Sequence, residues 1–87
     1  MMPTNSKSIL PTNTTIIETL KAGWESWPAP VIARTEISSF TGGLFCARSF
    51  ANYDSLGRGP GGKVKIGRNV GYLKADLIDW LMARLEV

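Results

Sequence analysis

The stretch KVKIGRNVGYL, residues 63–73, decides how the chain folds. Its two ends, 63–66 and 70–73, are rich in β-branched and aromatic residues, and 67–69 holds the glycine and asparagine of a tight turn. We therefore expect a β-hairpin with Arg68 at its tip. Because side chains alternate along a strand, one face should carry apolar side chains and the other the two lysines. The expected sets are Val64, Ile66, Val70 and Tyr72 on one face, and Lys63 and Lys65 on the other.

Two helices are expected on the N-terminal side of the hairpin. Residues 35–40 form the first, because Ile37 and Phe40 lie three positions apart and so share one helical face. Residues 46–56 form the second, which has an apolar stripe on one side and polar residues on the other. Glycines separate these helices and also fill the loop 57–62 that follows them. Two short helices joined by a glycine turn are typical of a helix-turn-helix.

A last helix is expected from residue 74 onward. Asp76 near its start and Arg84 near its end suit the helix dipole. Its apolar face is formed by residues with helical spacing, namely Leu77, Ile78, Leu81 and Leu85. The order helix, helix, β-hairpin, helix predicts a small winged helix-turn-helix, an α+β fold that is mainly α.

Residues 1–30 are expected to lie outside this domain. Positions 1–13 are polar and without periodicity, which predicts a mobile N-terminal tail. Helix-like spacing of apolar residues predicts a short helix at 14–24. The prolines of the stretch 27–30 disfavour helix in the residues before them and mark the boundary. The main domain therefore spans residues 31–87.

The composition excludes several classes of protein. The 87 residues contain no histidine and one cysteine, so the common metal-ligand sets, an internal disulfide and histidine-assisted nucleophiles are absent. We expect this residue, Cys46, to be a small buried side chain. No stretch has the composition of a membrane span or a secretory signal. We therefore expect a cytoplasmic protein without enzymatic activity, metal, cofactor or small-molecule substrate.

Positive charge is concentrated in one part of the chain. The formal net charge of the whole chain is +3, but residues 44–74 hold six cations against Asp54, a net charge of +5. Such a segment inside a helix-turn-helix favours a polyanionic partner. In winged helices the second helix enters the major groove of DNA and the hairpin lies along the backbone. These positions correspond here to Arg48, in the first turn of the second helix, and to Arg68.

Two groups of residues carry a resemblance to a known family. Near the C-terminus they are Lys65-Ile66-Gly67-Arg68, Val70, Tyr72, Asp76-Leu77 and Trp80-Leu81. Upstream they are Thr41-Gly42-Gly43-Leu44, the segment 49–55 (SFANYDS) and Gly57-Arg58-Gly59-Pro60. In these motifs residues 31–87 resemble the excisionase-type helix-turn-helix proteins, the AlpA-like branch of the MerR-like winged-helix group.

The resemblance implies a small DNA-binding protein of phage, integrative-element or regulatory origin, without enzyme activity or cofactor. By position, it implies recognition-helix contacts from Arg48, Ser49 and Asn52, and wing contacts from Lys63, Lys65 and Arg68. Arg58, in the loop between helix and wing, completes the expected DNA-binding surface.

These observations together predict a sequence-specific double-stranded DNA-binding protein, which serves as an excisionase-like architectural factor or a transcriptional regulator. Further partners that we consider are a recombinase and a second copy of the chain; a membrane is not expected. An alternative function is a protein-interaction adaptor. It would use the N-terminal segment, with Trp24, Trp27 and the apolar stripe Ile16-Ile17-Leu20, to bind a partner chain.

Overall fold

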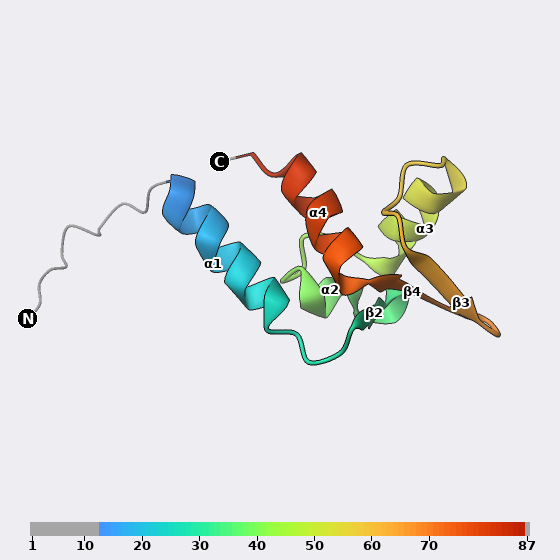
Figure 1. Cartoon of the computed structure of the whole chain (residues 1–87). Helices are drawn as coiled ribbons and strands as arrows, with labels where there is room; N and C mark the ends of the chain where they lie inside the picture. The colour runs from blue at the N-terminus through green and yellow to red at the C-terminus, as the bar shows by residue number, and fades with distance from the viewer. Residues whose placement is uncertain (1–12, 87) are drawn as a thin grey trace, which may run out of the picture.

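The computed structural model describes residues 13–86 and shows a small α+β fold (Figure 1). The elements in chain order are α1 (Asn13–Glu25), β2 (Val31–Ala33), the 3-10 turn η2 (Arg34–Glu36), α2 (Ile37–Phe40), α3 (Ala47–Ser55), β3 (Lys63–Ile66), β4 (Asn69–Leu73) and α4 (Lys74–Arg84). The expected helices and hairpin are therefore present. The helix expected at 35–40 is a 3-10 turn followed by one α-helical turn. The expected mobile tail falls almost wholly on positions 1–12, outside the described residues.

Strand β2, which the sequence analysis did not predict, turns the hairpin into a three-stranded antiparallel sheet with the order β2-β4-β3. Ala33 of β2 lies opposite Gly71 of β4. A Cβ atom at Gly71 would stand 2.7 Å from Cγ1 of Val31 and 3.2 Å from the carbonyl oxygen of Ile32. Glycine at position 71 therefore allows β2 to approach the middle of β4.

The register of the hairpin differs from the expected one. Lys63 lies opposite Tyr72 and Lys65 opposite Val70, so both lysines share a face with Tyr72. The prediction that the lysines and Tyr72 lie on opposite faces was wrong. The turn contains two residues, Gly67 and Arg68, rather than three, and a shift of one residue moves the side chains of one strand to the other face. Gly67 has a φ of +61°, which suits the first position of a type II′ turn.

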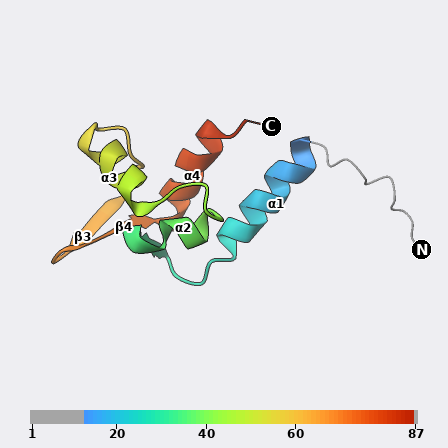
Figure 2. The ribbon, with the colours of Figure 1, turned by 180° about the vertical axis from the view of Figure 1, so that it is seen from behind.

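Helix α1 packs on α4 and contributes to the same core as residues 31–86 (Figures 1 and 2). Trp24 is 8% exposed and stacks on Phe40, which Trp27 meets edge-on. The Nζ atom of Lys74 donates hydrogen bonds to the carbonyl oxygens of Glu25 (3.0 Å) and Trp27 (2.9 Å). A cation at the C-terminal end of a helix also interacts favourably with the helix dipole. Both tryptophans therefore take part in the packing of the domain.

An aromatic group holds α3 against α4. Phe50 of α3 is fully buried, with its ring centroid 5.0 Å from that of Trp80 and 5.3 Å from that of Tyr72. Phe45 and Tyr53 pack edge-on around Trp80, at 5.6 and 5.2 Å. Edge-to-face pairs at such distances contribute about 0.5–1.5 kcal/mol each beyond the burial of their area. Aromatic rings of the core therefore fix the orientation of α3 on its buried side.

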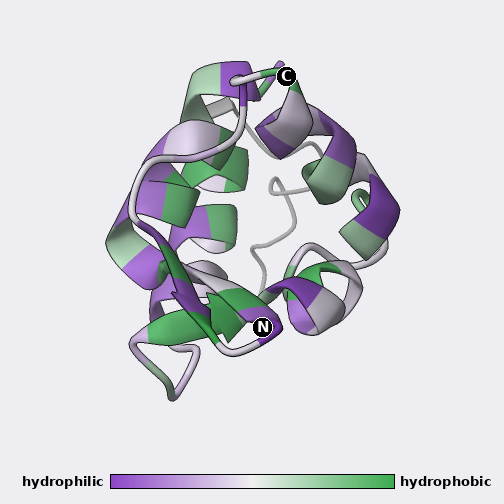
Figure 3. Ribbon diagram, turned by 90° about the vertical axis from the view of Figure 1, so that its right-hand side faces the viewer, coloured by the Kyte–Doolittle hydropathy of each residue, from purple (hydrophilic) through white to green (hydrophobic). Residues whose placement is uncertain are grey.

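The helices have one apolar and one polar side. Green hydrophobic and purple hydrophilic residues alternate along them (Figure 3), as expected where one side packs and the other meets water. Among residues 13–86, no helix has the length and apolar character needed to cross a membrane.

Candidate nucleic-acid interface

Helix α3 presents a polar face to solvent. Arg48 and Asn52, one helical turn apart, are exposed, and Ser49 between them is half-buried. Phe50 on the opposite side is completely buried. The three side chains predicted to read bases therefore lie on the outer side of α3, as helical spacing requires.

Cys46 stands at the N-cap of α3 and is exposed, so the expectation of a buried cysteine was wrong. Its Sγ atom lies 3.4 Å from Oγ of Ser49, and its side chain makes no capping hydrogen bond to the backbone of the helix. The hydrogen bond with Ser49 lowers the pKa of the thiol. The backbone of Cys46 is extended, with φ −131° and ψ 170°, so its side chain does not follow the helical spacing that turns Phe50 inward.

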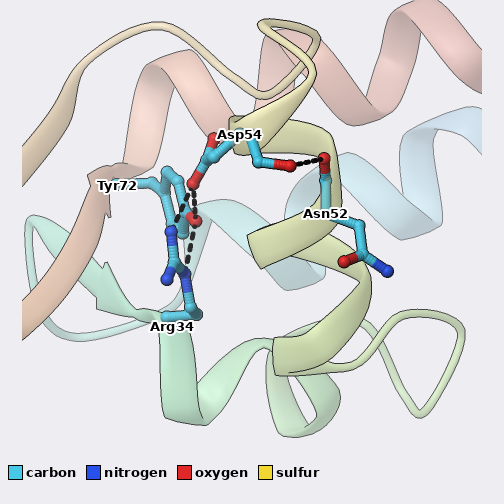
Figure 4. A network of polar contacts seen from close by, with 5 residues as sticks. Arg34, Asn52, Asp54 and Tyr72 are labelled. Carbon is cyan, nitrogen blue, oxygen red and sulfur yellow. Dashed lines mark hydrogen bonds and ion pairs between the residues drawn. The ribbon is translucent and has the colours of Figure 1, made fainter.

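Three side chains connect α3 to the sheet (Figure 4). Arg34 donates from Nε to the hydroxyl of Tyr72 (3.0 Å) and from Nη2 to Oδ2 of Asp54 (2.5 Å). The Tyr72 hydroxyl donates to the same Oδ2 atom at 2.6 Å. We call Arg34, Asp54 and Tyr72 the polar triad. Asn52 points away from it, so the two sides of α3 carry different groups (Figure 4).

The triad raises the pKa values of Tyr72 and Arg34. Burial, followed by the hydrogen bond to Asp54, raises the pKa of Tyr72 to about 12, so the phenol keeps its proton at neutral pH. The hydrogen bond with Tyr72 is the largest cause of the raised pKa of Arg34, which keeps its charge. Tyr72 thus remains a donor to Asp54, and the triad holds the end of α3 on the sheet without a net charge.

The loop between α3 and β3 packs against α3 and α4. A Cβ atom at Gly59 would stand 1.9 Å from Oδ1 of Asp54, so the loop lies directly over the triad. The carbonyl oxygen of Arg58 accepts hydrogen bonds from Nε1 of Trp80 (2.9 Å) and Nη2 of Arg84 (3.4 Å). The guanidinium of Arg84 also lies 3.7 Å from the centre of the Trp80 ring. The backbone of Arg58 is therefore anchored, while the residue as a whole is exposed.

The predicted contact residues gather at one end of the molecule. Helix α3 and the β3–β4 hairpin lie together at the end opposite α1 in both views (Figures 1 and 2). Within residues 44–73 five cations are exposed, namely Arg48, Arg58, Lys63, Lys65 and Arg68. The one carboxylate of this range, Asp54, is paired with Arg34 and its side chain is 9% exposed. Lys74, which the sequence analysis counted with these cations, is instead engaged at the end of α1.

The polar triad was not predicted from the sequence. One signal was present, because Asp54 follows Phe50 by four residues and must share its inward-facing side of α3. A carboxylate in that place requires a cation or other donors, since burying an unpaired charge is costly. The cation, Arg34, lies 20 residues away in the sequence, beyond the reach of any helical or strand period.

Residues 13–86 bring no three cysteine, aspartate or glutamate side chains together in a group able to hold a metal ion. No family model matches the chain, and no curated protein or solved structure is significantly similar to it.

Proposed function

We propose that the chain is a sequence-specific double-stranded DNA-binding protein with a winged helix-turn-helix, in which α3 enters the major groove and the β3–β4 hairpin is the wing. The observation that carries this proposal is the group of five exposed cations on α3, its following loop and the hairpin. The single carboxylate among them is neutralised by Arg34. A surface of this kind attracts the phosphates of a duplex.

The corrected register of the hairpin supports the same proposal. Lys63 and Lys65 share the sheet face from which Tyr72 reaches Asp54 of α3. They therefore project on the side of the sheet where α3 lies, and one duplex can meet both elements. In this arrangement Arg48, Ser49 and Asn52 contact base edges, while Lys63, Lys65, Arg68 and Arg58 contact phosphates.

The biological role that we propose is that of an excisionase-like architectural factor or a transcriptional regulator in the cytoplasm. Besides DNA, a recombinase or a second copy of the chain is the partner that such a role would use. This part of the proposal rests on the resemblance of residues 31–87 to the AlpA-like proteins.

The adaptor function has less support. Trp24 and Trp27, which would anchor a partner chain, both pack on Phe40. A hollow beside α1, next to Leu44, which is 75% exposed, is open to a partner. The exposure of Leu44 is thus the one observation that supports the adaptor function as a second candidate.

Selection of bound duplexes from a random pool, followed by titration of the selected duplex at several salt concentrations, tests the proposal. With three to five phosphate contacts, the logarithm of the affinity should fall against the logarithm of the salt concentration with a slope of roughly −3 to −5. Absence of binding at low salt would overturn the proposal. A flat salt dependence would point to an apolar docking surface instead.

A further inference from the structure

A hollow of about 170 Å³ lies where β2 ends and β4 runs on toward the tip of the hairpin. The last pair of the β2–β4 ladder is Ala33 with Gly71, so Asn69 and Val70 have no partner in β2. The turn η2 takes the chain away at this point and leaves the space open. The hollow is lined by Ala33, Arg34, Thr35, Arg68, Asn69 and Val70.

Arg34 lines this hollow, and its hydrogen bonds already fix the orientation of its guanidinium. Its Nε atom is bound to Tyr72 and its Nη2 atom to Asp54, and its side chain is 25% exposed. Among residues 13–86, no hydrogen bond engages its third nitrogen, Nη1. A guanidinium held in this way loses little conformational freedom when it binds a further acceptor.

The other lining residues favour an anion. Arg68 supplies a charge that no carboxylate of the described residues pairs with, whereas the charge of Arg34 is balanced by Asp54. Thr35 and Asn69 add a hydroxyl and an amide that can donate hydrogen bonds. No acidic side chain lines the hollow. Two arginines therefore line one small concave surface, and guanidinium groups match the several oxygens of a phosphate.

We propose that this hollow binds one backbone phosphate of the DNA, held between Arg34 and Arg68. The inference rests on the proposed DNA binding and adds a contact residue, Arg34, that lies outside both the helix-turn-helix face and the wing. The lysines of β3 lie across β4 from this hollow. Phosphates on both sides of the wing would then fix its position along the duplex.

The test is a scan of the selected duplex, in which each phosphate in turn is replaced by an uncharged methylphosphonate. For the natural chain, replacement of each contacted phosphate should weaken binding, and at the phosphate held in the hollow the loss should be about tenfold. Replacement of this phosphate should cost Arg34→Lys and Arg68→Ala much less than tenfold, because each variant has already lost one of the two guanidinium groups that hold it. Lys65→Ala is the matched control, which should bind more weakly overall but keep the tenfold effect at that phosphate.

A second measurement covers the case in which Arg34→Lys folds poorly. The chemical shift of the Arg34 Nε–H proton is measured by NMR in the natural chain. It should change when the unmodified duplex binds, and change less when the duplex modified at that phosphate binds. If the chain binds DNA but Arg34→Lys keeps the sensitivity of the natural chain at every phosphate, the inference is overturned and the proposed function stands. If the natural chain binds no duplex, both are overturned.

Discussion

Tyr72 of β4 and Asp54 of α3 meet where the last turn of the helix touches the sheet, with the phenol donating to Oδ2 at 2.6 Å. The ring of Tyr72 is fully buried, while its hydroxyl reaches the edge of the core where Arg34 is bound. A single residue therefore takes part both in the apolar core and in the polar link that fixes the proposed recognition helix relative to the proposed wing.

Removal of this hydroxyl should destabilise the fold. Tyr72→Phe leaves Arg34 and Asp54 without their shared partner, and we expect the free energy of unfolding to fall by about 1–3 kcal/mol. The free energy of unfolding is measured by urea denaturation, with tryptophan fluorescence as the probe. Tyr53→Phe is the control, because its ring packs on Trp80 and its hydroxyl makes no hydrogen bond within residues 13–86. Equal losses in the two variants would show that the link contributes nothing specific.

Stability should also fall at high pH. The pKa of Tyr72 is raised from 10.0 to about 12, so folding favours the protonated phenol. The protonated phenol therefore contributes fully to stability below about pH 10. This contribution is lost as the pH rises toward 12, which lowers the free energy of unfolding by an amount on the order of 2–3 kcal/mol. Denaturation at several pH values checks this for the natural chain. The loss should be smaller in Tyr72→Phe, and an identical decline in both would contradict the assignment.

The loop over the triad gives a matched pair of glycine substitutions. A Cβ atom at Gly59 would overlap Oδ1 of Asp54, whereas one at Gly61 would meet nothing within 4 Å, and neither glycine has a positive φ. We expect Gly59→Ala to lower the free energy of unfolding by about 1–3 kcal/mol, through displacement of Asp54. Gly61→Ala should change it by no more than about 0.5 kcal/mol. Thermal melting of both variants tests this prediction. Unchanged stability of Gly59→Ala would show that the loop can move away from Asp54 without cost.

The sequence predicted the helices and the hairpin because these depend on local periodicity. Strand β2 was missed because three residues show no period, and its pairing depends on Gly71 some 40 positions later. The register was wrong because the number of turn residues, two rather than three, decides which face each side chain takes. The exposed contact residues on α3 follow from helical spacing alone. The triad does not, since its members lie 18 to 38 positions apart and meet only in the folded chain.

Arg48 should distinguish between DNA sequences. It is exposed on the outer side of α3, where a guanidinium can reach a guanine in the major groove. We expect Arg48→Ala to weaken binding to the selected duplex by about 1–3 kcal/mol and to change binding to unrelated duplexes little. Parallel titrations with both kinds of duplex measure this. Equal weakening at both would assign Arg48 to a phosphate.

Arg68 should act differently, because it stands at the tip of the hairpin and is exposed to solvent. A phosphate contact positions the protein without reading bases. Arg68→Ala should therefore weaken binding to selected and unrelated duplexes alike, and the salt slope should become shallower by about 1. The stability of this variant should stay within about 0.5 kcal/mol of that of the natural chain, since exposed charges contribute little.

Titration at several salt concentrations and thermal melting test these two statements about Arg68→Ala. An unchanged slope with unchanged affinity would show that the tip stays clear of DNA, and a large fall in melting temperature would show that Arg68 is needed for the turn itself.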